Sequence, residues 1–406
     1  MLRGIHRTIH RTRELACRVA QARYLPWALA AGLLATSLAL ANLAFHHDGD
    51  ITHAIRVGRW FYEREGVAEL VRKSRPTLQP ENGFDGQFYY YLAHDPLLIN
   101  PATVRALDAP HLRARRILFP IVARLLVRHR SAIPRGLLLV LLGSVVGTGL
   151  VLAGFLKRAG LAPLWVACGV LTVGTAVPVD YLTCEPLGAF LAVAALAAWG
   201  CGRMALAWAA TAAAVLTKEP AAALAVAFAA TAARERRWRR AAVFAGAVVP
   251  WAAWALYLKL HLNVPSNPTD MAKNFTLPFQ GAFRATLHDW RMLSMGENER
   301  VYALRLLARL WFVLAAVVVI AAAVRRPSAA GVLGGLAALN ALMLSSGAEA
   351  PSFDYLAHFA RQLYLLTPAL FVMWTERRDR LSAWLLILHV PLALEAWRLL
   401  IAGKFI

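Results

Sequence analysis

Charged residues are scarce in this chain, and acidic residues are scarcer than basic ones. Only 17% of the 406 residues are charged, whereas a soluble domain carries about a quarter. The apolar fraction is 59% and the mean hydropathy is +0.51. Apolar segments of about 20 residues, the length that crosses a bilayer core, recur along the chain. The sequence therefore excludes a soluble globular protein and predicts an all-α, polytopic transmembrane helical bundle.

Cysteine is also rare. The four cysteines are Cys17, Cys168, Cys184 and Cys201. They lack the spacing of a metal site, and at least two of them fall in apolar segments. We therefore expect no disulfide framework, no metal and no cofactor.

The excess of basic residues, 44 against 23 acidic ones, gives a net charge of +21. The basic clusters are short and lie between apolar segments: Lys157-Arg158, Arg234 to Arg240, Arg325-Arg326 and Arg377 to Arg380. The long loops are balanced, with nine acids against nine Lys and Arg in residues 46–115 and four against four in residues 261–304. This is the positive-inside pattern. It places the short loops in the cytoplasm, predicts contact with anionic membrane lipids and argues against nucleic acid as a partner.

The chain is predicted to comprise a basic cytoplasmic arm, residues 1–24, and one transmembrane domain, residues 25–401. The first span, residues 25–45, is interpreted as an uncleaved anchor, because about 21 apolar residues are too many for a signal peptide. About 11 spans are expected in all. The others are residues 136–156, 161–179, 186–201, 203–217, 219–233, 241–260, 305–324, 328–346, 361–375 and 381–401. The periplasmic loops are then 46–135, 261–304 and 346–361.

Two helices are expected to lie along the membrane surface in the first loop. The apolar run 117–127 is too short to span, at about 11 residues. Arginines bracket this run, and a crossing here would put the later basic clusters on different sides, so we interpret it as a juxtamembrane helix. The spacing of Ile55, Trp60 and Phe61 predicts an interfacial amphipathic helix.

Residues 83–96, Gly-Phe-Asp-Gly-Gln-Phe-Tyr-Tyr-Tyr-Leu-Ala-His-Asp-Pro, are both polar and aromatic. Asp85 precedes Gly86, where the backbone can bend and approach a ligand closely. Gln87 adds an amide, and residues 88–91 form an aromatic block. A carboxylate beside aromatic rings suits a sugar. The alternative is a surface loop whose tyrosines lie in the interfacial aromatic belt.

Under this topology, further polar residues gather on the external side: Asp48, Asp50, Asp180, Glu185, Lys218, Glu219, Asp354, His358 and Arg361. Ionisable groups at membrane depth are costly and usually functional. Plainer interpretations remain open: solvated turn residues at Asp180 and Glu185, a local Lys218–Glu219 pair, and a lipid anchor at Arg361. A divalent-ion site of His46, His47, Asp48 and Asp50 is a further alternative.

The arrangement of these motifs resembles the GT-C class of membrane glycosyltransferases. That class includes protein O-mannosyltransferases, phosphatidylinositol-anchor mannosyltransferases and lipid A aminoarabinose transferases. Residues 83–93 are similar to an Asp-containing block of the anchor mannosyltransferases, and Leu-Thr-Lys-Glu at 216–219 to an LTKG turn of bacterial members. Two departures leave the base open: the paired acids of the first loop appear here as Asp48-Gly49-Asp50, and Glu219 replaces the glycine.

The resemblance implies an inverting glycosyltransferase of the bacterial inner membrane with a periplasmic active site. A polyprenyl-phosphate-sugar would be the donor, and a glycan, lipid or protein the acceptor. Asp85 would be the general base, with Asp50 and Asp48 as competitors. The remaining candidates would bind substrate: Lys218 and Arg361 on the donor phosphate, Arg115 and Arg116 as alternatives for it, and Gln87, Tyr89, Tyr90, Glu185, Glu219 and His358 elsewhere.

A transporter or lipid flippase is the main alternative, and a non-catalytic partner in envelope assembly is a third. Transporters often contain matching internal repeats, which we do not find in this sequence. The three hypotheses predict different structures. An enzyme should have Asp85 lining a cavity that opens sideways to lipid and also to water. A carrier should have its charges near the membrane midplane, between two related bundles, and a scaffold should have no cavity.

Overall fold

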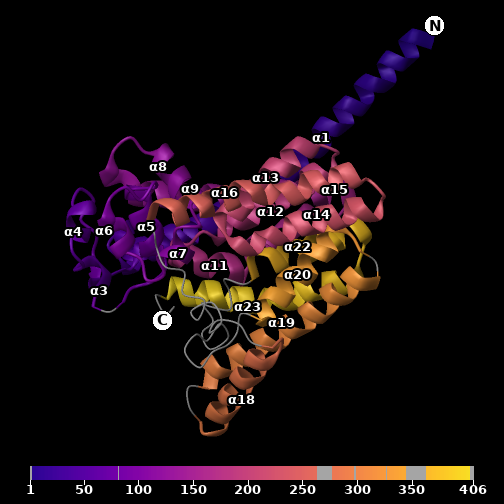
Figure 1. The fold of residues 1–406 in the computed structure, drawn as a ribbon. Coiled ribbons are helices and arrows are strands. Elements are labelled where there is room, and N and C mark those ends of the chain that lie inside the picture. The colour runs from indigo at the N-terminus through magenta and orange to yellow at the C-terminus, as the bar shows by residue number, and fades with distance from the viewer. Residues whose placement is uncertain are drawn as a thin grey trace.

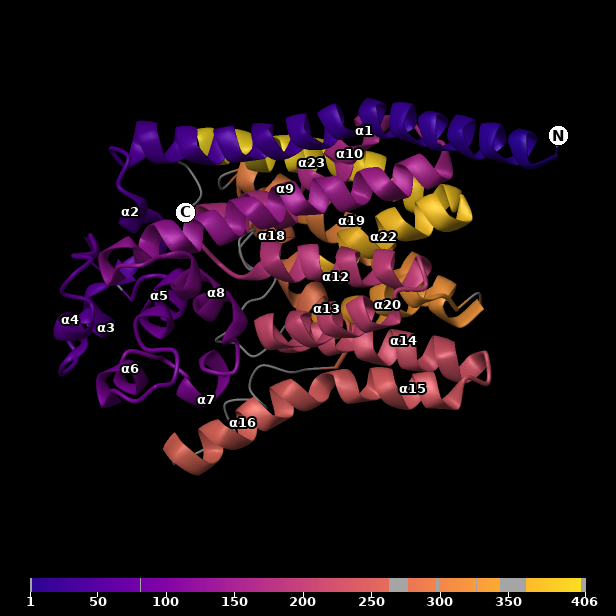
Figure 2. The same cartoon turned by 90° about the horizontal axis from the view of Figure 1, so that it is seen from above.

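The computed structural model describes residues 2–80, 82–262, 277–296, 299–325, 327–343 and 363–402, with side chains from residue 23 onward. Helices make up most of this part of the chain. Its only two strands, β1 (Val57–Gly58) and β2 (Leu78–Gln79), form a short parallel pair. The long helices run side by side, and the small helices of the first loop cover one end of the bundle (Figures 1 and 2).

The bundle contains helices of very different lengths. They are α1 (Leu2–His46), α9 (Ile133–Ala159), α10 (Val166–Val170), α11 (Val173–Asp180), α12 (Glu185–Gly200), α13 (Met204–Thr217), α14 (Ala222–Arg234), α15 (Trp238–Ala245), α16 (Val249–Leu262), α19 (Glu299–Arg325), α20 (Ala329–Met343), α22 (Leu363–Arg377) and α23 (Arg380–Ile401). The helix α18 (Gln280–Ser294) projects from the bundle beside α19 (Figure 1). Short 3-10 turns connect several of them: η1 (Arg130–Ala132), η2 (Pro163–Trp165), η3 (Glu219–Ala221) and η4 (Gly246–Val248).

In the described part of the chain, five helical segments are long and apolar enough to cross a membrane. The number rises to six if one bent pair, Pro163–Val170 with Val173–Asp180, counts as a single span. This is the composition of a multi-pass helical membrane protein. Helices such as α12, α13 and α20 are apolar but shorter, so length and composition do not establish the full set of predicted spans.

The bent pair corrects the prediction of one continuous helix over residues 161–179. Helices α10 and α11 meet at an angle of 51°. Thr172 between them has an extended backbone, and Pro178 in α11 cannot donate a backbone hydrogen bond to the preceding turn. Gly169 beside the bend packs so closely that an added Cβ would lie 2.4 Å from a methyl carbon of Leu152. The bend sets the direction of α11, which ends at Asp180.

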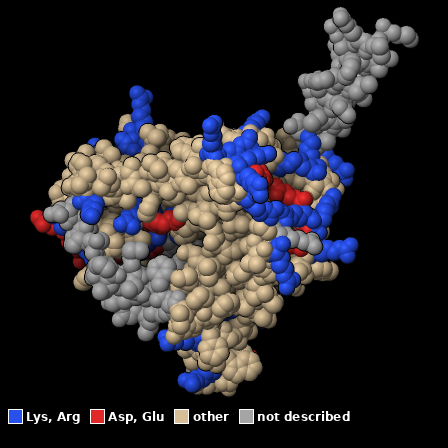
Figure 3. Space-filling model, turned by 45° about the vertical axis from the view of Figure 1, so that its right-hand side comes forward, with Lys and Arg blue, Asp and Glu red and all other residues tan. Residues whose placement is uncertain are grey.

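The two ends of the bundle differ in charge. At one end, Arg234 and Arg377 both donate to the carbonyl oxygen of Pro327 at 3.3 Å, and Arg378 donates to that of Ala159. The basic turns are therefore neighbours in space. Lys and Arg side chains gather there in Figure 3, next to a broad surface with almost no charge. The first loop covers the opposite end (Figure 2).

The first loop consists of short helices: α2 (Ile51–Ile55), α3 (Arg59–Tyr62), α4 (Val67–Leu70), α5 (Gly86–His94), α6 (Pro101–Arg105), α7 (Pro110–Arg113) and α8 (Leu118–Leu126). The prediction of a single amphipathic helix around Ile55 and Trp60 was wrong. Arg56 adopts a left-handed conformation with φ 53° and ends α2, and the chain then becomes extended at β1. Helix α8 is present where the predicted short helix lies, and it packs against α5 and α9.

The Asp85 stretch does not form the surface loop that was considered as an alternative, because residues 86–94 form the buried helix α5. A Cβ at Gly86 would lie 2.4 Å from the carbonyl oxygen of Tyr181 and 2.9 Å from that of Ile55. The glycine thus permits close contact between α5 and two other backbone segments, rather than with a ligand.

We predict that Gly86→Ala destabilises the protein by about 1–3 kcal/mol, the usual effect of overpacking. The two facing carbonyls belong to backbone and cannot turn away as a flexible side chain can. Thermal unfolding in detergent and limited proteolysis of the first loop would measure the effect. Gly143→Ala in α9 is the matched control, because an added Cβ there meets nothing within 4 Å. Equal stability of the two variants would contradict the prediction.

Candidate functional site

Asp85 lies at the start of α5 and lines a cleft of about 600 Å³. Its carboxylate accepts a hydrogen bond from Nη1 of Arg113 at 2.5 Å, and 16% of its side chain is exposed. The other residues of the cleft are mostly aromatic or polar: Trp60, Phe61, Asn82, Gly83, Phe84, Gln87, Phe88 and Asp108. The cleft thus joins an accessible carboxylate to exposed aromatic surface.

Arg113, the last residue of α7, connects the two carboxylates of the cleft. It contacts Asp108 through two nitrogens, at 2.8 and 2.9 Å, and its guanidinium lies 4.7 Å from the ring centre of Phe88. Burial alone would lower the pKa of Arg113, but Asp85 and Asp108 outweigh burial and raise it. The arginine therefore remains charged next to Asp85.

A second ion pair involves Arg116, three residues after Arg113. Nε of Arg116 is 2.9 Å from Oε2 of Glu219, at the start of η3. Burial would lower the pKa of Arg116, but Glu219 and weaker contributions from Tyr89, Cys184 and Asp85 raise it. The other carboxylate oxygen of Glu219 is buried and has no hydrogen-bond partner in the described part of the chain.

The third ion pair is the most buried of the three. Nζ of Lys218 lies 2.7 Å from Oε1 of Glu185, and their side chains are 5% and 0% exposed. Lys218 follows α13 in an extended conformation, and Glu185 is the first residue of α12. The ring centre of Tyr364 is 5.3 Å from the same ammonium group. Two charges at this depth are costly unless they are paired.

The structure brings five predicted residues into one region: Asp85, Arg116, Glu185, Lys218 and Glu219. They come from the first loop and from two turns between helices of the bundle. Cys184, beside Glu185, lies 3.1 Å from the hydroxyl of Tyr89 in α5, so the same turn also contacts the first loop. That these five residues lie on the external side of the membrane stays a prediction.

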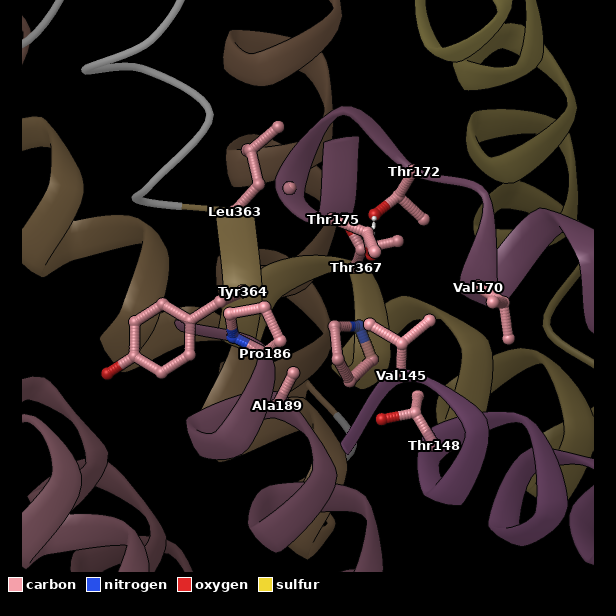
Figure 4. A pocket seen from close by; sticks show the side chains of 13 residues that line it. Val145, Thr148, Val170, Thr172, Thr175, Pro186, Ala189, Leu363, Tyr364 and Thr367 are labelled. Carbon is pink, nitrogen blue, oxygen red and sulfur yellow. Dashed lines mark hydrogen bonds between the residues drawn. The ribbon is translucent and has the colours of Figure 1, made fainter. Parts of the chain in front are cut away.

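A small cavity lies beside this cluster, between α9, α11, α12 and α22 (Figure 4). It is lined by several threonines: Thr148, Thr172, Thr175 and Thr367. At about 20 Å³ it has room for about one water molecule. The ring of Tyr364 points away from the threonines. This cavity is therefore too small for a sugar, and the cleft at Asp85 is the candidate site.

The competing acids of the first loop have different surroundings. Asp50 caps α2 by accepting bonds from the amide of Thr52 at 2.9 Å and the hydroxyl of Thr77 at 2.6 Å. Burial raises the pKa of Asp50, but these hydrogen bonds outweigh it and lower the pKa. Asp48 is exposed in a left-handed conformation. In the described part of the chain, no three His, Cys, Asp or Glu side chains are placed to share a metal ion.

The polar and aromatic residues that follow Asp85 turn inward. Gln87 accepts a bond from the Gly58 amide at 3.0 Å and donates to the Asn82 carbonyl at 2.6 Å. Tyr89 and Tyr90 are fully buried. Their contact with a sugar stays a prediction, but their rings are covered in this structure. The exposed ring in the cleft is that of Trp60, which is 64% exposed.

The remaining candidates lie apart from the three ion pairs or outside the described residues. The guanidinium of Arg115 lies 5.6 Å from the ring centre of Trp251, near the start of α16. His358 and Arg361, like Asp354, are outside the residues that the structure describes.

The sequence analysis missed two parts of this region. Arg113 and Asp108 were not among the candidates, although they complete the charge arrangement around Asp85. Asp180 was grouped with the external polar residues, with a solvated turn as the alternative, but its partners were not predicted: it is buried and accepts bonds from Arg56 at 3.0 Å and Asn42 at 2.7 Å. Nothing in the sequence distinguishes Arg113 from its neighbours Arg115 and Arg116, so its contact with Asp85 could not have been predicted.

A buried histidine makes the first loop sensitive to acid. Burial, with smaller effects of Arg130 and Arg124, lowers the pKa of His94 to about 3. Because its folded pKa is below the unfolded value, protonation favours the unfolded state. Its contribution is fully present above pH 6.5, and stability falls by about 1.4 kcal/mol per pH unit below that.

We therefore predict that thermal stability decreases between pH 7.5 and pH 4.5, and that His94→Gln flattens this dependence. Asp50 titrates below this range and does not contribute to it. Thermal unfolding of both proteins in detergent across the range would measure the two slopes. Parallel slopes would contradict the prediction.

Comparisons with known proteins return no relative: no protein-family model, no curated protein and no solved structure matches this chain. The function is therefore inferred from the cleft at Asp85 and the ion pairs beside it.

Proposed function

We propose that this protein is a membrane glycosyltransferase that moves a sugar from a polyprenyl-phosphate donor to an acceptor at the external membrane face. One observation carries the proposal. Asp85 lines an open cleft of about 600 Å³ together with exposed aromatic surface, and its partner Arg113 lies three residues before Arg116, which pairs with Glu219. The resemblance of residues 83–93 and 216–219 to GT-C glycosyltransferases supports the same function.

Asp85 would act as general base. Its carboxylate takes the proton from the acceptor hydroxyl, and the hydroxyl oxygen attacks the anomeric carbon of the donor. The bond between that carbon and the phosphate oxygen breaks, and polyprenyl phosphate leaves with inversion of configuration. Arg113 fixes the position of the carboxylate through its contact with Oδ2, within reach of an acceptor hydroxyl bound in the cleft.

The leaving phosphate requires fixed positive charge. Arg116 and Lys218 are the candidates within the described residues. Arg116 is the more accessible, because 11% of its side chain is exposed against 5% for Lys218. Arginine can also bind two phosphate oxygens at once. We therefore assign the phosphate first to Arg116. The phosphate would replace the carboxylate of Glu219 as the partner of this arginine.

The chain would sit in the bacterial inner membrane with about 11 crossings, counting the short apolar helices as spans. The basic turns would face the cytoplasm by the positive-inside rule. The cleft, at the opposite end of the bundle, would then open to the periplasm. ATP is absent there, and a sugar already linked to a lipid phosphate needs no further activation.

The test is turnover of polyprenyl-phosphate-linked sugars by the purified full-length protein in detergent. Several donor sugars are offered, and release of polyprenyl phosphate is measured. Release with any donor supports the proposal. No release by folded, lipid-binding protein would favour the alternative, a transporter or lipid flippase. That alternative would place the charges near the membrane midplane.

A further inference from the structure

A second cavity lies at the end of the bundle with the basic turns. It has a volume of about 460 Å³ and sits between η2, the end of α22 and the start of α23. Its lining combines tryptophans, arginines and aliphatic residues: Leu161, Trp165, Trp374, Arg378, Arg380, Ala383, Trp384, Leu386 and Ile387. The proposed function does not use this cavity.

The cavity has a polar mouth and an apolar wall. Arg378 lies in the turn before α23 and Arg380 is the first residue of that helix, along which Ala383, Leu386 and Ile387 follow. Trp165 and Trp374 meet edge to face, with ring centres 5.5 Å apart. Trp384 is 61% exposed. Tryptophan concentrates where the acyl chains of a bilayer meet the headgroups, so the wall fits the upper part of an acyl chain.

The arginines at the mouth carry uncompensated charge. Neither Arg378 nor Arg380 forms an ion pair within the described part of the chain. The acid between them, Asp379, is engaged with the amide and hydroxyl of Ser382 at the start of α23. The other nearby acid, Glu376, is exposed and interacts with Arg158 and Arg377 instead.

We propose that this cavity binds one anionic phospholipid. Its phosphate would contact Arg380 and Arg378, and an acyl chain would lie against Trp384 and Ile387. Two unpaired cations above an apolar wall complement this ligand, and basic pockets between helices on the cytoplasmic side bind such headgroups. The lipid would link the turn after α9 to the turn between α22 and α23, which the bond from Arg378 to Ala159 already joins.

The test uses delipidated full-length protein and phospholipids with dibrominated acyl chains, which quench nearby tryptophans. Dibrominated phosphatidylglycerol should quench at lower concentration than dibrominated phosphatidylcholine. Arg380→Gln should weaken binding of phosphatidylglycerol about fivefold, the ratio given by about 1 kcal/mol per basic residue. Trp384→Phe should remove part of the quenching and so place the lipid in this cavity.

Arg240→Gln is the matched control, because it removes an exposed arginine from another basic turn at the same end. It should leave binding unchanged. Inorganic phosphate at millimolar concentration should not displace the lipid, since it lacks the acyl chain. Equal affinity for the two phospholipids, equal effects of the two arginine variants, or displacement by phosphate would each overturn the proposal. The result is independent of glycosyl transfer, so the two proposals can fail separately.

Discussion

Asp85→Asn is expected to lower the turnover of a polyprenyl-phosphate-sugar by about 10²–10⁴-fold, the usual contribution of a general base. Asparagine keeps the size of the side chain but cannot accept the proton. Folding should survive, because Arg113 retains its two bonds to Asp108 when the charge of Asp85 is removed. The loss should therefore appear in kcat, while the thermal midpoint changes little.

Asp50→Asn is the informative companion variant, because Asp50 is the competing base. Its carboxylate is committed to Thr52 and Thr77 as a helix cap. We expect little loss of stability, because asparagine caps a helix about as well as aspartate, with turnover nearly intact. If turnover instead follows Asp50 and is unchanged in Asp85→Asn, the base has been assigned to the wrong residue.

The second large effect is expected at Lys218 and Glu185. Replacing either alone, as Lys218→Met or Glu185→Leu, leaves a buried charge without this partner and should cost about 3–5 kcal/mol. Replacing both should recover most of that loss, because apolar side chains of similar volume are tolerated where a buried pair was. Thermal or denaturant unfolding in detergent of the two single variants and the double variant measures the coupling.

The exposed pair Glu395 and Arg398 provides the control. Its members are 33% and 53% exposed, and such surface pairs contribute about 0–1 kcal/mol. Single variants at Lys218 that cost as little as those at Arg398 would show that the buried pair is not a structural element. A double variant that folds well but releases no polyprenyl phosphate would give the pair a role in donor binding.

The convergence of the site could be predicted in part from the sequence. When all the basic turns are placed in the cytoplasm, the predicted topology puts Lys218, Glu219 and Glu185 on the same, opposite side of the membrane. Topology alone therefore brings them near the first loop. The partners could not be predicted, because Arg113, Arg115 and Arg116 look alike in sequence. These contacts depend on the folded path of the first loop. It places Arg113 beside Asp85, Arg115 beside Trp251 and Arg116 beside Glu219.

The aromatic block shows a second limit of the sequence. Tyr89 and Tyr90 fit a ligand site, an interfacial belt and a protein core equally well, since each of these accepts a ring with a polar tip. Their burial depends on α5 lying against α8 and α11, which are distant in sequence. The bend after α10 was similarly hidden, because hydropathy stays high across it and only Pro178 marks an irregularity.

Under the proposed function, the pairing of Arg113, Arg116 and Lys218 with carboxylates would shape the catalytic cycle. A donor phosphate would have to compete with an anion that the protein itself supplies. Such competition would weaken the binding of both the donor and the polyprenyl phosphate product. Product dissociation would then be easier, because the carboxylates would return to their cations as the lipid phosphate departs. In the resting protein, a carboxylate would thus occupy the place at each cation that the phosphate of the leaving group takes during the reaction.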